Sequence, residues 1–221
     1  MLLVISGLIA TAQSSTNLGF DQTVSAQLPI NLSVLGGTAR ATADIHFEEA
    51  ERNERFGDLD AAVAMYNKAA SEFREDKKYS RYCESLIRLS NVHLTLSNYA
   101  EAEKIVLKQV LKTYSKIESR TGQMLAYQQL GKIYLSVNKL PQSLWFYTQH
   151  GILAQQLQNK TAYIESILGI ASVKIKKRDY QLAIKDLNTA ELLSKNANTA
   201  QYNQQIKANR ALIAERTTKK G

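Results

Sequence analysis

The stretch Arg178-Asp-Tyr-Gln-Leu-Ala183 has three earlier counterparts in the chain, and their spacing decides the fold. Each counterpart begins with a turn-forming or polar pair, continues with Leu or Tyr, and ends on a small residue. They read Gly57-Asp-Leu-Asp-Ala-Ala62, Ser97-Asn-Tyr-Ala-Glu-Ala102 and Asn138-Lys-Leu-Pro-Gln-Ser143. The final small residues are 40, 41 and 40 positions apart. A unit of about 40 residues therefore occurs four times, which is typical of a repeat architecture.

Each unit has the pattern of two amphipathic helices, because apolar residues recur at intervals of three and four. A small residue where two helices cross lets them approach closely, and a large residue one turn later fills the space beside it. Those large residues are Tyr66, Val106, Tyr147 and Leu187. Such pairs bury their apolar faces only by stacking on their neighbours. The predicted helices are 41–56, 59–75, 79–96, 99–115, 118–136, 141–157, 160–176, 180–194 and 199–216.

The third unit also carries Tyr127-x-x-Leu130-Gly131-x-x-Tyr134 on its first helix, and the second carries Leu86-x-x-Leu89-Ser90-x-x-His93. These residues resemble the tetratricopeptide repeat family, in which a large residue, Leu-Gly and Tyr mark the first helix. The second helix of that family ends its pattern on a small residue. Ala69 and Ala190 match that position, whereas Gln109 and His150 do not.

The resemblance covers about residues 41–195, and the first unit is degenerate on its first helix. It implies an all-α tetratricopeptide-type solenoid of about four helix pairs with a C-terminal capping helix. A period near 40 exceeds the usual 34 residues of the family, so the chain is similar to its long-repeat subgroup. The predicted organisation is a signal peptide at 1–12, a flexible linker at 13–40, repeats at 41–78, 79–117, 118–159 and 160–198, and a capping helix and tail at 199–221.

The segment Met1–Ala12 is apolar and ends in Ala10-Thr11-Ala12, which is an A-x-A cleavage site. It lacks the basic start of a signal peptide, since no Lys or Arg precedes Arg40. A buried N-terminal strand is the alternative interpretation. A working signal predicts a periplasmic or secreted protein, and a non-working one a cytoplasmic protein. The longest apolar run is this one, and it is too short to span a bilayer. We therefore expect no membrane-spanning segment in the mature chain.

The chain has 221 residues and a net charge of +8, which is unevenly distributed. Residues 41–78 carry a net −4 and residues 79–221 a net +12. A basic body can attract nucleic acid or other acidic partners. Here the lysines are spread over many helical turns, which favours a role in solubility. An array with interleaved aromatic residues for stacking bases would be needed for single strands, and none is seen, so nucleic acid is the least favoured partner.

The sequence carries no pattern of catalytic residues. It has no phosphate-binding glycine loop, no nucleophile elbow and no H-E-x-x-H motif. The three histidines, His46, His93 and His150, fall on packing positions of three different repeats, and Cys83 falls on the first helix of repeat two. We expect these residues to pack between helices. The sequence therefore predicts a protein that is not an enzyme and has no metal site or cofactor.

The resemblance implies that a concave groove, lined by the first helices, binds a protein or peptide. Family positions two, five, nine and twelve of each repeat line this groove. Asn91, Gln128 and Lys132 are predicted to hydrogen-bond a peptide backbone, while Ile87, Leu125 and Leu168 supply apolar contact. The alternative is an unoccupied solenoid face. The residues selected from these positions as the candidate peptide-binding site are Phe47, Glu51, Ile87, Asn91, Leu125, Gln128, Lys132, Leu168 and Ser172.

A second candidate surface is centred on Trp145, because Leu144, Trp145, Phe146 and Tyr147 place apolar groups all around one helix. Trp145 either contacts a neighbouring protein or packs on the next repeat.

Three functions of different class follow from these observations. The first is a non-catalytic, exported bacterial binding scaffold of the tetratricopeptide type, which could form the sensory part of a signalling system. The second is a cytoplasmic peptide-responsive regulator. The third is a basic nucleic-acid-binding array.

Overall fold

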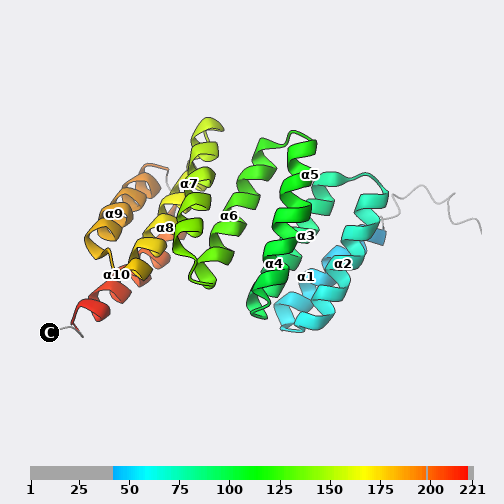
Figure 1. Cartoon of the computed structure of the whole chain (residues 1–221), viewed down its shortest axis with the longest axis horizontal. Helices are drawn as coiled ribbons and strands as arrows, with labels where there is room; N and C mark the ends of the chain where they lie inside the picture. The colour runs from blue at the N-terminus through cyan, green and yellow to red at the C-terminus, as the bar shows by residue number, and fades with distance from the viewer. Residues whose placement is uncertain (1–41, 198, 219–221) are drawn as a thin grey trace, which may run out of the picture. The chain divides into compact units, whose positions relative to one another are not determined.

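A computed structural model describes residues 42–197 and 199–218, and all of its regular structure is helical. Four consecutive helix pairs are followed by one further helix (Figure 1). The helices are α1 (Thr42–Phe56), α2 (Leu59–Glu75), α3 (Tyr79–Thr95), α4 (Tyr99–Ile105) continued by η2 (Val106–Val110) and α5 (Leu111–Lys116), α6 (Arg120–Ser136), α7 (Leu140–Gln156), α8 (Lys160–Lys177), α9 (Tyr180–Asn196), and η3 (Ala200–Tyr202) leading into α10 (Asn203–Thr218). The predicted all-α solenoid is confirmed.

Each helix packs on the next one in the chain, which is the arrangement expected of stacked pairs. The first helices of successive pairs also contact each other, α3 with α6 and α6 with α8. The second helices α4, α7 and α9 make no comparable contacts in the described part of the chain. The first helices therefore form the inner row. Helix α10 contacts both α8 and α9, so it continues this inner row.

The small residues that revealed the repeat lie where the helices cross, and all four are fully buried: Ala62, Ala102, Ser143 and Ala183. The Ser143 hydroxyl keeps a hydrogen-bond partner there, because its Oγ donates to the carbonyl oxygen of Gly131 at 2.8 Å. Large side chains fill the space above and below these crossings, and Tyr66, Phe73 and Leu187 are 0% exposed. The helix crossings therefore have the packing that the sequence predicts.

The helices begin where the sequence supplies caps. The side chains of Asp58, Ser119 and Asn159 accept hydrogen bonds from backbone N–H groups in the first turns of α2, α6 and α8, at 3.1, 3.1 and 2.9 Å. Pro141 lies in the first turn of α7, where its missing N–H has no cost. The observed ends of α1 to α9 lie within two residues of the predicted ones, and those of α2 coincide with them.

One helix contains an extra residue. The helix N-caps follow one another at intervals of 20 residues, with Asn98 to Ser119 as the exception at 21. The helix between these two contains the π-helical segment η2, which accommodates one additional residue. Because of the extra residue, Val110 occupies the buried position that Ala69, His150 and Ala190 hold in the other repeats. Val110 is 0% exposed. The assignment of Gln109 to that position was therefore wrong.

The predicted signal peptide at 1–12 and linker at 13–40 lie outside the described residues. Among the helices that the structure describes, none combines the length and the apolar character needed to cross a membrane.

Candidate functional site

The inner helices α3 and α6 enclose a hollow of about 380 Å³, called here the central hollow. Aliphatic and amide side chains line it together with charged ones from both helices. Five of the predicted groove residues meet there, two from α3 and three from α6. The lining residues are Ser80, Glu84, Ile87, Arg88, Asn91, Tyr114, Leu125, Gln128, Gln129 and Lys132.

A second hollow of about 330 Å³, called here the C-terminal hollow, lies between α6, α8 and α10. Gln128 and Lys132 line both hollows, so the two adjoin at these side chains. The other lining residues are Leu135, Tyr147, Glu165, Leu168, Gly169, Ser172, Tyr202 and Gln205. Together the two hollows extend along the inner row from α3 to α10.

The charged side chains at the α1–α3 end of the inner row are paired with one another. Arg81 binds Asp44 at 2.9 Å and Glu84 at 2.6 Å. Arg88 of α3 binds Glu51 of α1, in the preceding helix pair, at 3.1 Å. These groups are partly exposed, so each ion pair contributes little to stability. Asp44 and Glu84 share Arg81, so these five groups together carry a net charge of −1.

Lys132 differs from these cations because no ion pair to it occurs among residues 42–197 and 199–218. The nearby carboxylate of Glu165 accepts hydrogen bonds from Gln128 Nε2 at 2.8 Å and from the Tyr202 hydroxyl at 3.1 Å. Lys132 is exposed to solvent, although protein packed around its stem lowers the pKa of its ammonium, while the charge of Glu165 acts in the opposite direction. A cation without a bound counter-charge thus stands at the junction of the two hollows.

The amide groups beside Lys132 retain hydrogen-bonding capacity. Asn91 is half-buried, and its side-chain amide has no hydrogen-bond partner in the described part of the protein. Gln128 uses its Nε2 to reach Glu165, which leaves its Oε1 as an acceptor. Leu125 is 42% exposed and Ile87 is half-buried in the same hollow. Polar and apolar groups of this kind are what an extended peptide requires.

Two of the predicted groove residues are buried and cannot contact a ligand at the surface. Phe47 is only 4% exposed, because the Arg81 guanidinium covers its ring at 4.5 Å and Tyr66 packs against its edge at 5.6 Å. Leu168 borders the C-terminal hollow but is 1% exposed and packs in the core formed by α8, α9 and α10. Both are core residues in this structure, which corrects the expectation that they contact a ligand.

The remaining predicted residues are placed as follows. Glu51 lies outside both hollows and is held by Arg88. Ser172 lines the C-terminal hollow, and its hydroxyl donates to the Leu168 carbonyl oxygen at 2.9 Å. Arg88 and Gln205 line hollows but were not predicted. The position rule omits Arg88, and Gln205 contributes only because α10 packs against the inner row, which no spacing in the sequence indicates.

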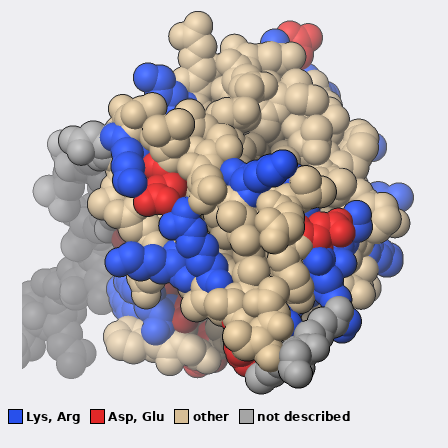
Figure 2. All heavy atoms as spheres, turned by 90° about the vertical axis from the view of Figure 1, so that its left-hand side faces the viewer, with Lys and Arg blue, Asp and Glu red and all other residues tan. Residues whose placement is uncertain are grey.

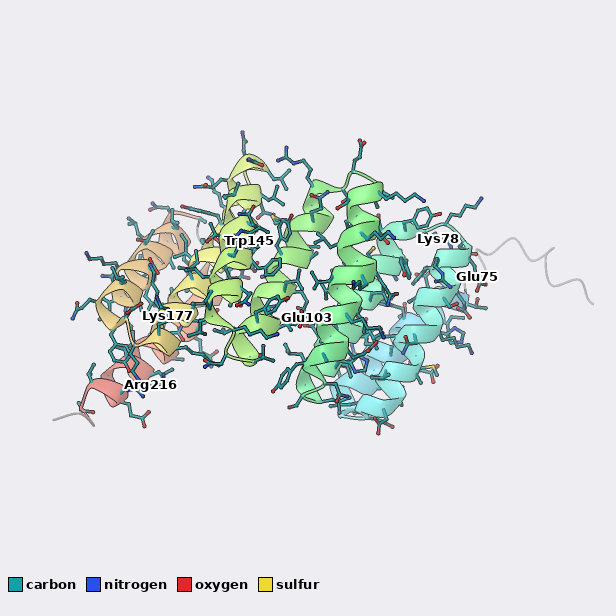
Figure 3. All side chains as sticks on the ribbon, viewed as in Figure 1. Glu75, Lys78, Glu103, Trp145, Lys177 and Arg216 are labelled. Carbon is teal, nitrogen blue, oxygen red and sulfur yellow. The ribbon has the colours of Figure 1, made fainter. Side chains whose placement is uncertain are left out.

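Trp145 lies on α7, away from the two hollows, and is 52% exposed (Figure 3). Its ring also packs edge-on against Tyr127 at 6.1 Å and Phe146 at 4.7 Å. Phe146 in turn stacks on Tyr134 at 5.3 Å, and the Tyr134 hydroxyl donates to Glu103 of α4 at 2.6 Å. Trp145 thus packs within its own repeat while about half of its surface is open to solvent.

A larger hollow of about 630 Å³ lies where the α3–α4 turn faces the α6–α7 turn. Its charged groups are engaged: Glu103 accepts the hydrogen bond from Tyr134, and the Lys139 ammonium lies over the Tyr134 ring at 5.7 Å. It offers fewer free polar groups than the central hollow, so it is a weaker candidate site.

The histidines and the cysteine pack between helices, as predicted. His46 Nδ1 lies 2.9 Å from Glu72, and His150 is 1% exposed. Cys83 is fully buried, and burial raises the pKa of its thiol to about 12, which makes it unreactive. No cluster of three or more metal-ligating side chains occurs in the part of the chain that the structure describes.

Basic and acidic side chains are interspersed on the face at the α9–α10 end (Figure 2). Figure 2 shows Lys and Arg side chains at the α9–α10 end in separate groups, some of them beside acidic side chains. Arg210 and Lys195 both bind Glu191, at 2.7 and 2.9 Å, and Lys174 binds Asp186 at 2.7 Å. Pairing of this kind favours the solubility interpretation of the charge over binding to nucleic acid.

Comparison with known proteins supports the fold. No protein-family model matches the chain, and no curated protein matches its sequence. Solved structures do match. The apo form of RapI is similar with a TM-score of 0.70 and 12% identity, over 82% of this chain and 66% of RapI. BtubC from P. vanneervenii is similar with a TM-score of 0.63 and 17% identity. That match covers 71% of this chain, which spans 64% of the length of BtubC.

Proposed function

We propose that this chain, which has the tetratricopeptide-repeat fold, is a non-catalytic scaffold that binds an extended peptide segment of another protein along its inner helices. One observation carries the proposal: Ile87 and Asn91 of α3 converge with Leu125, Gln128 and Lys132 of α6 on the central hollow. Residues of two successive repeats, separated by about 40 positions in the sequence, thus meet at one site.

The chemistry of the central hollow suits a peptide backbone. An extended peptide has N–H and C=O groups without partners, and it gains affinity where a surface supplies matching groups. The Asn91 amide can donate to a peptide carbonyl, and Gln128 Oε1 can accept from a peptide N–H. Ile87 and Leu125 can bury an aliphatic side chain of the peptide, which adds a hydrophobic contribution in proportion to the area removed from water.

The test uses the full chain and a phage-displayed library of random 12-residue peptides. Enriched peptides are synthesised, and their affinities are measured by isothermal titration calorimetry. We expect the double variant Asn91→Ala/Leu125→Ala to weaken binding at least tenfold. The matched control is Asn196→Ala/Leu192→Ala on the outer helix α9, where Leu192 is 59% exposed; it should bind as the wild type does. Failure to enrich any peptide, or equal affinity of the two double variants, would contradict the proposal.

The proposal includes export from a bacterial cell, supported by the apolar segment and cleavage pattern of Met1–Ala12. The scaffold would then act in the periplasm or outside the cell, as the sensory part of a signalling system. Mass spectrometry of the N-terminus after cell fractionation tests this part separately. A mature protein that starts at Gln13 in the envelope fraction is expected. A cytoplasmic protein that still starts at Met1 would overturn export and favour a peptide-responsive cytoplasmic regulator instead.

A further inference from the structure

We infer that the C-terminal hollow is a pocket for a carboxamide side chain, so that the bound peptide places a glutamine or asparagine there and its amide hydrogen-bonds to the Tyr147 hydroxyl. This inference rests on the proposed function and specifies one side chain of the ligand. Its basis is the hydroxyl group of a buried tyrosine, which reaches the hollow without a hydrogen-bond partner.

Tyr147 reaches the hollow from the opposite side of the inner row. It belongs to the outer helix α7 and is only 5% exposed. Its ring packs against Gly131 of α6 and Gly169 of α8, and yet Tyr147 lines the hollow between α6, α8 and α10. Because the side chain extends from α7 between two inner helices, its far end is the part that reaches the hollow. That end carries the hydroxyl.

The Tyr147 hydroxyl lacks the partner that its counterpart in the first repeat has. Tyr66 holds the equivalent position, and its hydroxyl donates to the Glu54 carboxylate at 2.6 Å. The residue equivalent to Glu54 in the third repeat is Leu135, which lines the C-terminal hollow and has no side-chain acceptor. Within the described residues no hydrogen bond to the Tyr147 hydroxyl occurs, and burial raises its pKa. The hydroxyl is therefore a protonated donor that can bind a group placed in the hollow.

The charges that line the hollow balance, which favours a neutral ligand group. Lys132 and Glu165 are the ionised side chains among the lining residues, and they have opposite signs. A charged group of either sign would therefore lie near one like charge. The Glu165 carboxylate accepts one hydrogen bond at each oxygen, from Gln128 and from Tyr202, so each oxygen can still accept another.

A carboxamide has the donors and the acceptor that these groups require. Its carbonyl oxygen can accept from the Tyr147 hydroxyl, and its NH₂ group can donate to Glu165. Gln205 also lines the hollow, and its side chain makes no hydrogen bond with the described part of the chain, so its amide is available as well. A volume of about 330 Å³ leaves room for a side chain, since one water molecule occupies only ~30 Å³ in the liquid.

The position of the hollow also defines what accompanies the carboxamide in the peptide. The C-terminal hollow adjoins the central hollow at Gln128 and Lys132. A peptide that lies along the inner row therefore places an aliphatic residue against Ile87 and Leu125 and its glutamine or asparagine beyond it, toward α8 and α10. The selected peptides should share both features.

The first measurement selects peptides from the phage-displayed 12-residue library with the full wild-type chain and with Tyr147→Phe. This substitution removes the hydroxyl and keeps the ring between the two glycines. The wild type should enrich Gln or Asn at one position, and Tyr147→Phe should select peptides without this preference. Because the hydroxyl has no partner within the described protein to lose, Tyr147→Phe should unfold at the same urea concentration as the wild type.

Tyr66→Phe is the matched control. Tyr66 is 0% exposed and lines neither hollow, and its hydroxyl is bound to Glu54. Removing this hydroxyl should lower the urea midpoint, because a buried hydrogen bond is lost. The variant should nevertheless select the same Gln-containing or Asn-containing peptides as the wild type.

The second measurement uses the best wild-type peptide, synthesised with a fluorescein label in three forms. One form keeps the carboxamide, one carries the acid in its place (Glu for Gln, Asp for Asn), and one carries an apolar residue of similar shape (Met for Gln, Leu for Asn). Affinities are measured by fluorescence anisotropy. The wild type should bind the carboxamide form about tenfold more tightly than either other form, which is the effect of a net loss of one or two hydrogen bonds.

The two hydrogen-bonding partners predict different changes in these ratios. In Tyr147→Phe the advantage of the carboxamide over the apolar form should fall below about threefold, whereas Tyr66→Phe should retain it. In Glu165→Gln the advantage of the carboxamide over the acid form should fall below about threefold, because the like charge is removed. Circular dichroism verifies that each variant is folded.

The outcomes separate this inference from the proposed function. Selected peptides without Gln or Asn, or a carboxamide advantage that is unchanged in both Tyr147→Phe and Glu165→Gln, would overturn the inference. If these peptides still lost affinity in Asn91→Ala/Leu125→Ala, the peptide scaffold would stand. A lower urea midpoint for Tyr147→Phe would reveal a partner of the hydroxyl within the protein and overturn the inference too. Selection of no peptide at all would overturn both.

Discussion

The ring of Tyr147 on α7 occupies the space that a side chain on Gly169 of α8 would need. A Cβ atom on Gly169 would lie 2.4 Å from ring atoms Cδ1 and Cε1 of Tyr147, and a Cβ on Gly131 of α6 would lie 2.9 Å from the same atoms. Tyr147 itself is 5% exposed, so its ring has little room to move. One tyrosine thus packs between the first helices of two repeats, and the two glycines permit its position.

Replacing Gly169 by alanine should destabilise the array. Alanine favours a helix over glycine by about 1 kcal/mol, but the overlap with the Tyr147 ring forces repacking that typically costs about 1–3 kcal/mol. At 2.4 Å the overlap is severe, so we expect Gly169→Ala to lower the free energy of unfolding by about 2 kcal/mol. Urea unfolding monitored by circular dichroism at 222 nm measures this.

The same substitution tested with a smaller residue on α7 provides the control. In a Tyr147→Leu background the ring is absent, so Gly169→Ala should cost less than it does in the wild type. A Gly169→Ala variant as stable as the wild type, or an equal cost in both backgrounds, would show that the Tyr147 ring does not limit the position.

The turns between the helices repeat one backbone conformation. Each of the seven turns from α1 to α9 contains one residue with a positive φ angle. Six of these seven residues are not glycine. The next N–H then donates to a carbonyl five residues earlier, as from Asn159 to Ala154 at 2.8 Å, which is the hydrogen bond of a Schellman motif. These positive-φ residues are Gly57, Lys77, Ser97, Glu118, Asn138, Gln158 and Arg178, with φ between 53° and 81°.

Glycine at these turns should stabilise the protein. The left-handed conformation costs a residue with a Cβ about 1–2 kcal/mol, and glycine avoids this cost while adding entropy to the unfolded chain. We expect Glu118→Gly and Gln158→Gly each to raise the free energy of unfolding by about 0.5–1 kcal/mol in urea titrations. Lys185→Gly, on an exposed helical position of α9, should instead lower it by about 1 kcal/mol. Loss of stability in both turn variants would contradict this account of the turns.

The sequence predicted the helices because the same packing requirement recurs every 40 residues. Small residues such as Ala62 and Ala183 were predicted to be buried where two helices cross, and both are fully buried. The conformation of the turns could not be predicted from the sequence, because Glu118 and Gln158 are not residues that favour positive φ. Their conformation is imposed by the helices on either side, which override the local preference of the residue.

The groove was predicted only in part, for a related reason. Position rules locate residues on the inner face of a helix, which was sufficient to bring Asn91 and Lys132 together. They do not show what covers a residue. Phe47 is buried because Arg81 of the next pair lies over its ring, and Leu168 because α9 and α10 complete its core. Those contacts depend on neighbouring repeats and leave no local signal in the sequence.

One feature of the sequence indicates the π-helical segment: Ala102 and Ser143 are 41 residues apart, whereas the corresponding residues of the other repeats are 40 apart. Lys108 lies in this segment and is exposed. Deleting Lys108 should convert the helix to regular α-helix and restore the 20-residue interval of the N-caps. Buried Val110 and Tyr114 then take the spacing that their counterparts have in α2, α7 and α9. We expect the variant to unfold cooperatively, with a Tm within a few degrees of the wild type.

A deletion in a regular helix provides the comparison. Thr148 is exposed on α7, which has no extra residue. Its deletion should rotate His150 and Ala154 out of the core, because one residue corresponds to about 100° around the helix. We expect a loss of cooperative thermal unfolding in this variant. If both deletions reduced the stability equally, the interpretation of the π-helical segment as a one-residue insertion would be wrong.

His150 should make the protein sensitive to mild acid. It is 1% exposed, and neither ring nitrogen has a hydrogen-bond partner in the described structure. Burial, with a smaller contribution from the Lys132 charge, lowers its pKa from 6.5 to about 4. Between these pH values the unfolded chain binds a proton that the folded one does not, so the free energy of unfolding falls as the pH is lowered from about 6.5 to about 4. At 1.36 kcal/mol per pKa unit, the full loss is about 3 kcal/mol.

The variant His150→Leu removes this titration and keeps a side chain of comparable size. Urea unfolding of wild type and variant is measured from pH 7 to pH 4.5, and the difference between the two free energies isolates the histidine from the carboxylates, which titrate in both proteins. We expect the wild type to lose stability relative to the variant by about 2 kcal/mol over this range. Parallel pH dependences would mean that His150 is protonated without penalty in the folded state, through a partner or a rearrangement of α7.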